Sequence, residues 1–449
     1  MGTLLINNLG RLITGTRGAS ALLGHANMLD PPYDRYLRAQ SHRTVWLARP
    51  GDVMIVPTPI DRQFLEYATG LRGFGPADLT VLGPGTAHTA GFAETVTRAI
   101  ADRRAEKAWP YYFDRTAAAL VRSLDLPVPG FTGQGGAELL NSKVMFRALA
   151  AGIGVPIAEG VVPASAAEAE EYVWAALSLG HCVIVKQDFH VGGLGNEIAS
   201  PGERIRPIGA RQVHHCTDRE SVARFVARHW KAGHAEHEHR VVVERYTPDS
   251  RSIYVGFHLT DDGAEAYGHG EMRMTPIING LITPSPAASS PAFAEFLGHA
   301  ERLADAVRVM GYRGQLSVDG VLTPGEDVFL TEFNARSGGA THNHCIMSQL
   351  AEPHGETDRI MLDRRRCTLP PLEKLLTTLD GEGLGFDTTR RSGVVVTVHD
   401  GGTGRETGEF CAVAENLETA ELLENDAVAA IRGLGGAVAE AESETKEQV

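Results

Sequence analysis

Two apolar segments joined by a short turn constrain the fold of this 449-residue chain more than any other feature. The segments Gln315 to Leu322 and Val328 to Phe333 flank Pro324-Gly325-Glu326-Asp327, whose composition is typical of a four-residue turn. The sequence therefore predicts a β-hairpin. Each strand carries one acid, Asp319 or Glu332, in an otherwise apolar run, which favours a specific role for these two side chains.

The register of this hairpin would place the two acids opposite each other. If Thr323 pairs with Val328, Asp319 faces Glu332, and Asn334 lies two residues further on the same face. Like charges directly opposite one another destabilise a sheet, and a bound cation removes the conflict. Oxygen donors of this kind suit Mg²⁺, so we predict that Asp319, Glu332 and Asn334 bind it. The alternative is a solvated hairpin face with unrelated acids, and a slip of one residue would break the pairing. On this register, Asp319→Asn and Glu332→Gln should each relieve the repulsion and stabilise the metal-free protein.

A lysine and a glycine-rich loop form a second signal. Lys186 ends an apolar strand predicted from Cys182 to Gln187, and the loop follows at once. Glycines let backbone N–H groups approach a phosphate closely. The loop lacks the spacing of a Walker A or dinucleotide motif, so taken alone it is better explained as an ordinary turn. The loop residues are Val191, Gly192, Gly193, Leu194, Gly195 and Asn196.

Two further cations lie where an anion would account for them. Lys143 falls in the first turn of a helix expected from Ser142 to Gly152, with Asn141 or Ser142 as its cap. A cation there opposes the helix dipole by about 0.3–1 kcal/mol, a cost that a nearby anion offsets. Arg336, just after the hairpin, could contact a phosphate or carboxylate through two hydrogen bonds. An exposed lysine and a surface arginine are the alternatives.

Two polar stretches of the sequence can each be interpreted in two ways. An apolar strand from Val241 runs into Glu244, Arg245 and Tyr246, and such an end can present backbone donors and acceptors to a purine edge. An ordinary strand end is the alternative. Histidines crowd the segment from Val213 to Arg240, which is compatible with a metal tract. Their spacing matches no zinc pattern and favours a solvated helix end and loop.

Composition limits the classes of partner. Lys plus Arg number 42 and Asp plus Glu number 56, which gives a formal net charge of −14. This charge argues against non-specific nucleic-acid binding. No apolar run approaches the ~18 residues of a membrane helix, and we see no secretory signal. The five cysteines are scattered and include no Cys-x-x-Cys pair, which favours reduced thiols. We therefore expect a cytoplasmic protein with small-molecule partners, neither nucleic acid nor membrane.

Apolar runs and helical patterns alternate in the first part of the chain and predict an α/β domain. A Pro- and Gly-rich stretch near residues 126–136 is a natural boundary. After about residue 390, a strand from Gly393 to Val398 opens a small α/β piece, and the charged tail 441–449 is expected to be disordered. The predicted domains are 1–130, 131–385 and 386–449.

The order of these features resembles the ATP-grasp superfamily. Lys143, Lys186 with its glycine loop, Glu244, Asp319 and the run from Glu332 to Arg336 follow one another over about residues 130 to 350. Together with both flanking domains, the chain resembles the pheganomycin-type peptide ligases. The resemblance implies an α/β and α+β architecture. It consists of an ATP-grasp fold, whose two lobes clamp ATP, with an N-terminal α/β (pre-ATP-grasp) domain and a small C-terminal α/β piece.

The resemblance also implies roles for single residues. Asp319, Glu332 and Asn334 would hold Mg²⁺, and Arg336 would steady the transferred phosphoryl group. Arg273 would hold the substrate carboxylate or the tetrahedral intermediate. Ser250-Arg251-Ser252 replaces a stretch in which the family often carries a ribose-binding acid, and Asp249 is the substitute. The predicted catalytic residues are Lys186, Arg273 and Arg336. The predicted ATP contacts are Lys143, Lys186, Val191, Gly192, Gly193, Leu194, Gly195, Asn196, Glu244, Arg245, Tyr246 and Asp249.

The expected activity is an ATP-dependent peptide or amide ligase in specialised metabolism, such as antibiotic biosynthesis. It would join a carboxylic acid, activated as an acyl-phosphate, to the amine of a peptide or amino acid and release ADP and phosphate. A ligase for simple amino acids or small amines is one alternative. A nucleotide-binding regulator without turnover is another, which the full metal set disfavours. The sequence leaves the oligomeric state open, with a homodimer as one assembly to test.

Overall fold

The computed structural model describes residues 2–8, 39, 41–83, 91–189, 192–202, 205–231, 240–274, 276–353, 355, 358–401 and 407–438. The loop residue Val191, three histidines of the tract (His234, His237 and His239) and the tail 441–449 lie outside this set. The chain divides into two compact units. The first comprises Met1–Gln134, Gly280–Pro284 and Gly339–Val449, and the second comprises Gly135–Asn279 and Ser285–Gly338. The predicted three-domain division follows the chain order instead and stays a prediction.

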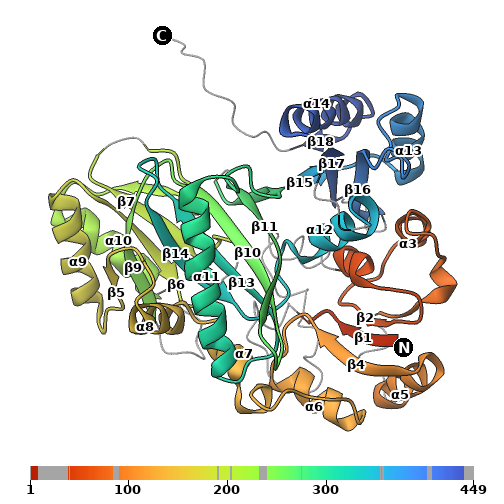
Figure 1. Cartoon of the computed structure of the whole chain (residues 1–449). Coiled ribbons are helices and arrows are strands. Elements are labelled where there is room, and N and C mark those ends of the chain that lie inside the picture. Colours follow the sequence, from red (N-terminus) through yellow and green to blue (C-terminus); the bar gives the residue numbers. More distant parts are fainter. Residues whose placement is uncertain are drawn as a thin grey trace. The chain divides into compact units, whose positions relative to one another are not determined.

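A parallel sheet opens the first unit, with the strand order β3-β2-β1-β4 (Figure 1). Its strands are β1 (Gly2–Ile6), β2 (Val53–Ile55), β3 (Thr80–Leu82) and β4 (Ala105–Pro110). Apolar side chains of β1 and β2 form a core with Val96 and Ala99 of helix α5 (Phe92–Arg103). The neighbouring helices are α3 (Arg62–Gly70), α6 (Arg115–Ser123), η3 (Pro76–Asp78) and η4 (Thr132–Gln134). The predicted N-terminal α/β domain is confirmed.

The rest of the first unit is an antiparallel arrangement near the C-terminus. Residues 280–283 of β12 pair with β15, which pairs with β17, which pairs with β16, while β18 also pairs with β15. The strands are β12 (Ile278–Thr283), β15 (Ile360–Thr368), β16 (Gly393–Asp400), β17 (Thr407–Ala414) and β18 (Ala437–Val438). The helices are α12 (Thr341–Ile346), η5 (Met347–Ala351), α13 (Leu372–Gly381) and α14 (Leu417–Gly433).

One sheet of the second unit contains the predicted hairpin. Its strands follow the order β14-β13-β10-β11 and are antiparallel. They are β10 (Arg251–Leu259), β11 (Ala264–Met274), β13 (Gly314–Leu322) and β14 (Val328–Asn334). Helix α11 (Pro291–Val309) runs along this sheet in Figure 1, and its Phe296 ring lies against the backbone of Gly320. This helix is followed by Gly311, whose positive φ of 103° is typical of a residue just after a helix end.

The other sheet of the second unit has the order β5-β9-β6-β7-β8. Its strands are β5 (Gly160–Val161), β6 (Cys182–Gln187), β7 (Asn196–Ser200), β8 (Val213–His215) and β9 (Val241–Tyr246). Helices α9 (Ala166–Ser178) and α10 (Arg219–Lys231) pack on Val183, Val185 and Val243. Because strand side chains alternate, Lys186 and Glu244 project from the opposite face.

Helices α7 (Gly136–Leu139) and α8 (Lys143–Ile153) complete the second unit. Ser142 caps α8, since its hydroxyl accepts a hydrogen bond from the Met145 N–H at 3.1 Å. The Phe146 ring meets Phe333 of β14 edge to face, with centroids 5.5 Å apart. This packing brings the first turn of α8 beside the hairpin.

We predict that Gly160→Ala destabilises the second unit by about 1–3 kcal/mol. A Cβ at Gly160 would lie 2.4 Å from Val243 O and 2.9 Å from Glu244 Cα, and these backbone atoms cannot yield easily. The strand pair β5–β9 must then shift. Chemical denaturation followed by circular dichroism measures the loss.

The matched control is Gly152→Ala in α8, where an added Cβ meets nothing within 4 Å. Alanine costs less conformational entropy in a helix, so this variant should be neutral or more stable by up to about 1 kcal/mol. Equal stability of the two variants would contradict the packing described for β5.

Candidate active site

The hairpin forms as predicted, but its register near the turn differs. Leu322, not Thr323, pairs with Val328, so the predicted pairing at the turn is wrong by one residue. Thr323 instead belongs to the loop, where its N–H donates to Asp327 O at 3.0 Å. The loop is therefore longer than its composition indicated.

A β-bulge restores the predicted pairing further along. Gly320 pairs with Leu330, whereas Asp319 pairs with Glu332, so Thr331 is the additional residue in β14. The two carboxylates stand opposite each other, as the sequence predicted. The reason is a bulge that the sequence analysis did not foresee.

Asp319 is buried and Glu332 is half-buried, and polar groups of the hairpin surround both carboxylates. The Asn334 side-chain amide donates to Asp319 Oδ2 at 3.2 Å and to Glu332 Oε1 at 3.4 Å. The Ser317 hydroxyl donates to Asp319 Oδ1 at 2.7 Å. The hairpin thus brings Asp319, Glu332 and Asn334 together on one face, which is the set predicted to hold a metal.

The two acids differ in electrostatic environment. Burial and the charge of Glu332 raise the pKa of Asp319 to about 8. Burial would also raise the pKa of Glu332, but the positive charges of Lys143, Lys186 and Arg336 outweigh it and lower this pKa to about 2. At neutral pH the pair therefore carries roughly one negative charge instead of two.

Lys143 lies at the start of α8, buried, with its Nζ 3.0 Å from Glu332 Oε2. Asp188, just after β6, holds this helix end in place. Its Oδ1 accepts hydrogen bonds from the Ser142 hydroxyl at 2.7 Å and from the Val144 N–H at 3.0 Å. The negative charge of Asp188 at the helix N-terminus offsets the unfavourable position of the Lys143 cation.

Lys186 joins a buried ionic group on the second sheet. Its Nζ lies 2.5 Å from Glu244 Oε2, and Arg147 of α8 donates to Glu244 Oε1 at 2.8 Å. The strand register explains the first contact, because Glu244 pairs with Ile184 and Lys186 follows two residues later on the same face. The charge of Lys186 also acts on Glu332, so this lysine links the two sheets of the unit.

Arg336 directs its Nη1 to the side-chain oxygen of Asn141. The Asn141 amide nitrogen in turn donates to Ala137 O at 2.6 Å and to Ala335 O at 3.3 Å. The guanidinium is therefore held beside the hairpin by a residue of the segment that precedes α8. Its charge contributes to the low pKa of Glu332.

The glycine loop connects β6 to β7. Gly192 and Gly193 adopt the left-handed conformation, with φ 61° and 78°. A Cβ on Gly193 would lie 2.9 Å from Gly209 O, so glycine is required there on both counts. The Asn196 side chain donates to Gly209 O at 2.9 Å, and the Gln187 N–H donates to Gly195 O at 3.1 Å. Leu194 lies within the same turn.

The other predicted site residues lie in the same unit, outside the ionic cluster. Arg245 is exposed on β9, and its N–H donates to Glu159 O at 2.7 Å. The Tyr246 hydroxyl contacts the backbone of Ile208. Asp249 is exposed with φ 57°, and Arg273 is half-buried on β11. Their roles toward ATP or substrate stay predictions.

The histidine tract contains a different feature. His214 Nε2 and His229 Nε2 lie 2.5 and 3.3 Å from Glu197 Oε2. Burial would raise the pKa of Glu197, but these histidine contacts outweigh it and lower the pKa well below its usual range. His215 is exposed at the end of β8.

Three residues position the site but were not predicted to contact the site residues. They are Asn141, Arg147 and Asp188. Asn141 was considered only as a helix cap, and Asp188 was not singled out. Each acts through a contact between residues far apart in the chain, such as the one between Arg147 and Glu244. The one local signal was Asp188, a carboxylate directly after a buried strand.

Family models match three parts of the chain. Residues 41–126 match the pre ATP-grasp domain, and residues 142–256 match the carbamoyl-phosphate synthase L chain, ATP binding domain. Residues 374–427 match the PGM1 C-terminal domain. The chain is an ATP-grasp superfamily protein with a pre-ATP-grasp domain. The second of these matches covers Lys143, Lys186, the glycine loop and Glu244.

Solved structures share the ATP-grasp fold with this protein. A biotin carboxylase from Campylobacter jejuni is 15% identical with a TM-score of 0.57, and the match covers 96% of this chain and 91% of that one. The biotin carboxylase domain of a 2-oxoglutarate carboxylase from Hydrogenobacter thermophilus, solved with MgADP, is 14% identical (TM-score 0.56, coverage 95% and 89%). An L-amino acid ligase from Bacillus licheniformis is 12% identical (TM-score 0.54, coverage 95% and 96%). The comparison with curated proteins found no match.

Among the described residues of this ATP-grasp protein, no helix is both long and apolar enough to cross a bilayer.

We predict that Asp319→Asn and Glu332→Gln have opposite effects on the metal-free protein, in contrast to the similar effects expected from the sequence. The folded-state pKa of Asp319, about 8, lies above its ordinary value of 3.8, so its contribution to stability is lost as pH rises from about 4 to about 8. Asp319→Asn removes this loss and should raise Tm by a few degrees at pH 8 and by less at pH 5.

Glu332→Gln should lower Tm instead. The folded-state pKa of Glu332, about 2, lies below its ordinary value of 4.5, so the ionised group stabilises the fold above about pH 4.5. The variant leaves Lys143 buried beside a neutral amide. Thermal melts in the presence of a chelator test both effects, with Glu326→Gln in the exposed turn as control. Equal shifts for the two site variants would refute the asymmetry.

Proposed function

We propose that the protein is an ATP-dependent carboxylate–amine ligase that releases ADP and phosphate. The observation that carries this proposal is the arrangement of Lys143, Lys186 and Arg336 around the opposed pair Asp319 and Glu332. With Asp319 largely protonated, the cations of this cluster outnumber its charged acids, an excess that suits a polyphosphate. Phosphoryl transfer depends mainly on such positioning and charge stabilisation.

Mg²⁺ would be held by Asp319, Glu332 and Asn334. The residues fit this ion, because three oxygen-bearing side chains converge and the raised pKa of Asp319 marks a site at which a cation would relieve repulsion. When bound, Mg²⁺ would neutralise charge on the phosphate oxygens. The Asn334 amide, which donates to both acids, would turn its oxygen to the ion.

ATP would lie against the face of the sheet that carries Lys186 and Glu244, opposite the face covered by α9 and α10. In this proposal Lys143 and Lys186 contact the phosphates and the base, and the turn from Gly192 to Asn196 covers the phosphates. The strand end from Glu244 to Tyr246 borders the adenine, and Asp249 binds the ribose. Lys186 would then lose part of its ion pair with Glu244, because one ammonium group cannot pair fully with both the Glu244 carboxylate and a phosphate.

The reaction starts on the carboxylic acid substrate. A carboxylate oxygen attacks the γ-phosphorus, the bond to the bridging oxygen breaks, and ADP leaves with its electron pair. The resulting acyl-phosphate is attacked by an amine, and the tetrahedral intermediate collapses to an amide with loss of phosphate and a proton. In this scheme Arg336 stabilises the transferring phosphoryl group and Arg273 the substrate carboxylate or the intermediate.

The proposed amine is that of a peptide or amino acid. Support comes from the match to the PGM1 C-terminal domain, from the resemblance to pheganomycin-type ligases and from the L-amino acid ligase among the structural neighbours. A ligase for single amino acids or other small amines is the alternative. We also propose a cytoplasmic location, a role in specialised peptide metabolism and, by analogy with the dimeric neighbour from Hydrogenobacter thermophilus, a homodimer.

We predict that ATP is cleaved to ADP and phosphate, with transfer of one carboxylate oxygen to the phosphate. A panel of carboxylic acids, each offered with single amino acids and with peptides, identifies a substrate pair by mass spectrometry. The active acid is then labelled with ¹⁸O in its carboxyl group. Labelled phosphate supports acyl-phosphate formation, whereas AMP with pyrophosphate would show adenylation and sink the proposal.

We predict that Glu332→Gln lowers turnover by about 100-fold or more, because the metal contributes several kcal/mol to the transition state. The matched control is Glu326→Gln, which makes the same change in the exposed turn of the hairpin and should retain full activity. ADP release measured against Mg²⁺ concentration separates weaker metal binding from slower chemistry. Wild-type turnover in Glu332→Gln would remove the metal assignment.

A further inference from the structure

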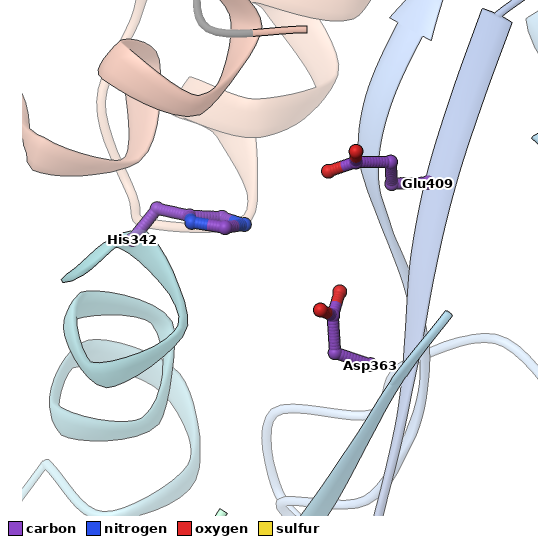
Figure 2. Close-up of side chains that lie close together, drawn as sticks. All are labelled: His342, Asp363 and Glu409. Atoms are coloured by element: carbon purple, nitrogen blue, oxygen red, sulfur yellow. The ribbon is translucent and has the colours of Figure 1, made fainter. Parts of the chain in front are cut away.

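A second group of potential ligands lies in the first unit, apart from the residues proposed for ATP. His342 is the second residue of helix α12, Asp363 lies on β15 and Glu409 lies on β17 (Figure 2). One donor atom from each residue lies within 4.8 Å of the other two. Figure 2 shows the imidazole ring directed toward the space between the carboxylates. The pairing of Asp363 with Cys411 places Glu409, two residues away, on the same face of the sheet.

All three side chains are removed from solvent. Their exposed fractions are 2% for His342, 0% for Asp363 and 4% for Glu409. Two guanidinium groups hold the acids in place. Arg43 donates to both oxygens of Glu409 at 2.8 and 2.6 Å, and Arg365 donates to Asp363 Oδ2 at 2.6 Å. A carboxylate has about four lone-pair sites, so these contacts leave capacity for a further ligand.

The imidazole of His342 is fixed as an electron-pair donor. Its ring forms a hydrogen bond with the backbone of Gly339, whose carbonyl also accepts from Arg365 at 2.8 Å. Within the described residues, Nε2 has no hydrogen-bond partner, so Nδ1 must make the Gly339 bond. Burial and the charges of Arg43 and Arg365 keep the pKa of His342 well below its ordinary value, so the ring is neutral. Nε2 therefore turns a lone pair toward two carboxylates.

The three donors direct lone pairs toward one small space, and a cation placed there would be stabilised by all of them. In a metal-binding histidine, the ring nitrogen that does not bind the metal often donates its N–H to a backbone carbonyl. This hydrogen bond fixes the tautomer and the orientation of the ring. We propose that His342 Nε2, Asp363 and Glu409 bind a divalent transition-metal ion. One imidazole with two carboxylates suits Mn²⁺, Fe²⁺, Co²⁺ or Zn²⁺, in contrast to the all-oxygen set proposed for Mg²⁺. This site does not depend on the proposed ligase function.

The charges around the site predict its affinity. Two guanidinium groups already balance the two carboxylates, so the donor set has no net charge. Binding should be weaker than at a site with unpaired acids, and a chelator should strip the ion. Titration into the stripped protein is therefore a better test than the metal content of purified protein.

The experiment titrates Co²⁺ into the full-length, chelator-treated protein without nucleotide. We expect visible d–d absorption that saturates at one ion per chain. His342→Ala should weaken this binding by about 10-fold or more. His258→Ala, which removes an exposed imidazole, should leave it unchanged. Glu332→Gln should also leave it unchanged, which separates this ion from the one proposed at the hairpin.

A second measurement covers the case in which His342→Ala does not fold. Zn²⁺ added to wild-type protein labelled with ¹⁵N-histidine should shift one Nε2 resonance while the Nδ1 proton of the same ring is retained. The absence of saturable binding, or equal Co²⁺ binding in folded His342→Ala, would overturn the proposal. So would a doubly protonated His342 ring or displacement of Co²⁺ by methylammonium, because a proton or an amine would then be the cation.

Discussion

The repulsion between Asp319 and Glu332 is the constraint on which the rest of the site depends. Two carboxylates directly opposite in a buried hairpin cannot both stay ionised without compensation. The two acids differ in charge in the structure. Lys143, Lys186 and Arg336 stabilise the negative charge of Glu332, whereas the raised pKa of Asp319 favours its protonated form. A metal ion would replace that proton. A cation bound at the hairpin would therefore compensate the repulsion between the two carboxylates.

The cations that stabilise Glu332 are themselves fixed by residues far along the chain. Lys143 occupies an unfavourable position at a helix start, and Asp188 compensates by anchoring that helix end. Lys186 is paired with Glu244, which Arg147 also contacts. Removal of any one member leaves another charge buried without its partner, and such losses are costly. This interdependence explains why α8, β6, β9 and the hairpin have to be considered as one site.

Sequence reasoning found several of the charged residues that the structure brings together, but not the residues that position them. Asp319, Glu332 and Lys186 could be recognised because each interrupts or ends an apolar strand, a pattern that depends only on local alternation. Asn141, Arg147 and the group of His342, Asp363 and Glu409 could not, because each contact joins distant segments and has no fixed spacing. Asp363 follows a short apolar run and Glu409 precedes one, but nothing in the sequence indicated that β15 and β17 pair.

The β-bulge at Thr331 shows how narrowly the geometry is set. Without the additional residue, the register observed near the turn would continue, and Asp319 would face Thr331 instead of Glu332. The bulge therefore creates the carboxylate pair. Gly320 lies directly beside the bulge, where a Cβ would lie 2.7 Å from the Phe296 ring and 3.0 Å from Phe329 O. The hairpin therefore packs against α11 through a residue without a side chain at the point where its register changes, and that change places Glu332 instead of Thr331 opposite Asp319.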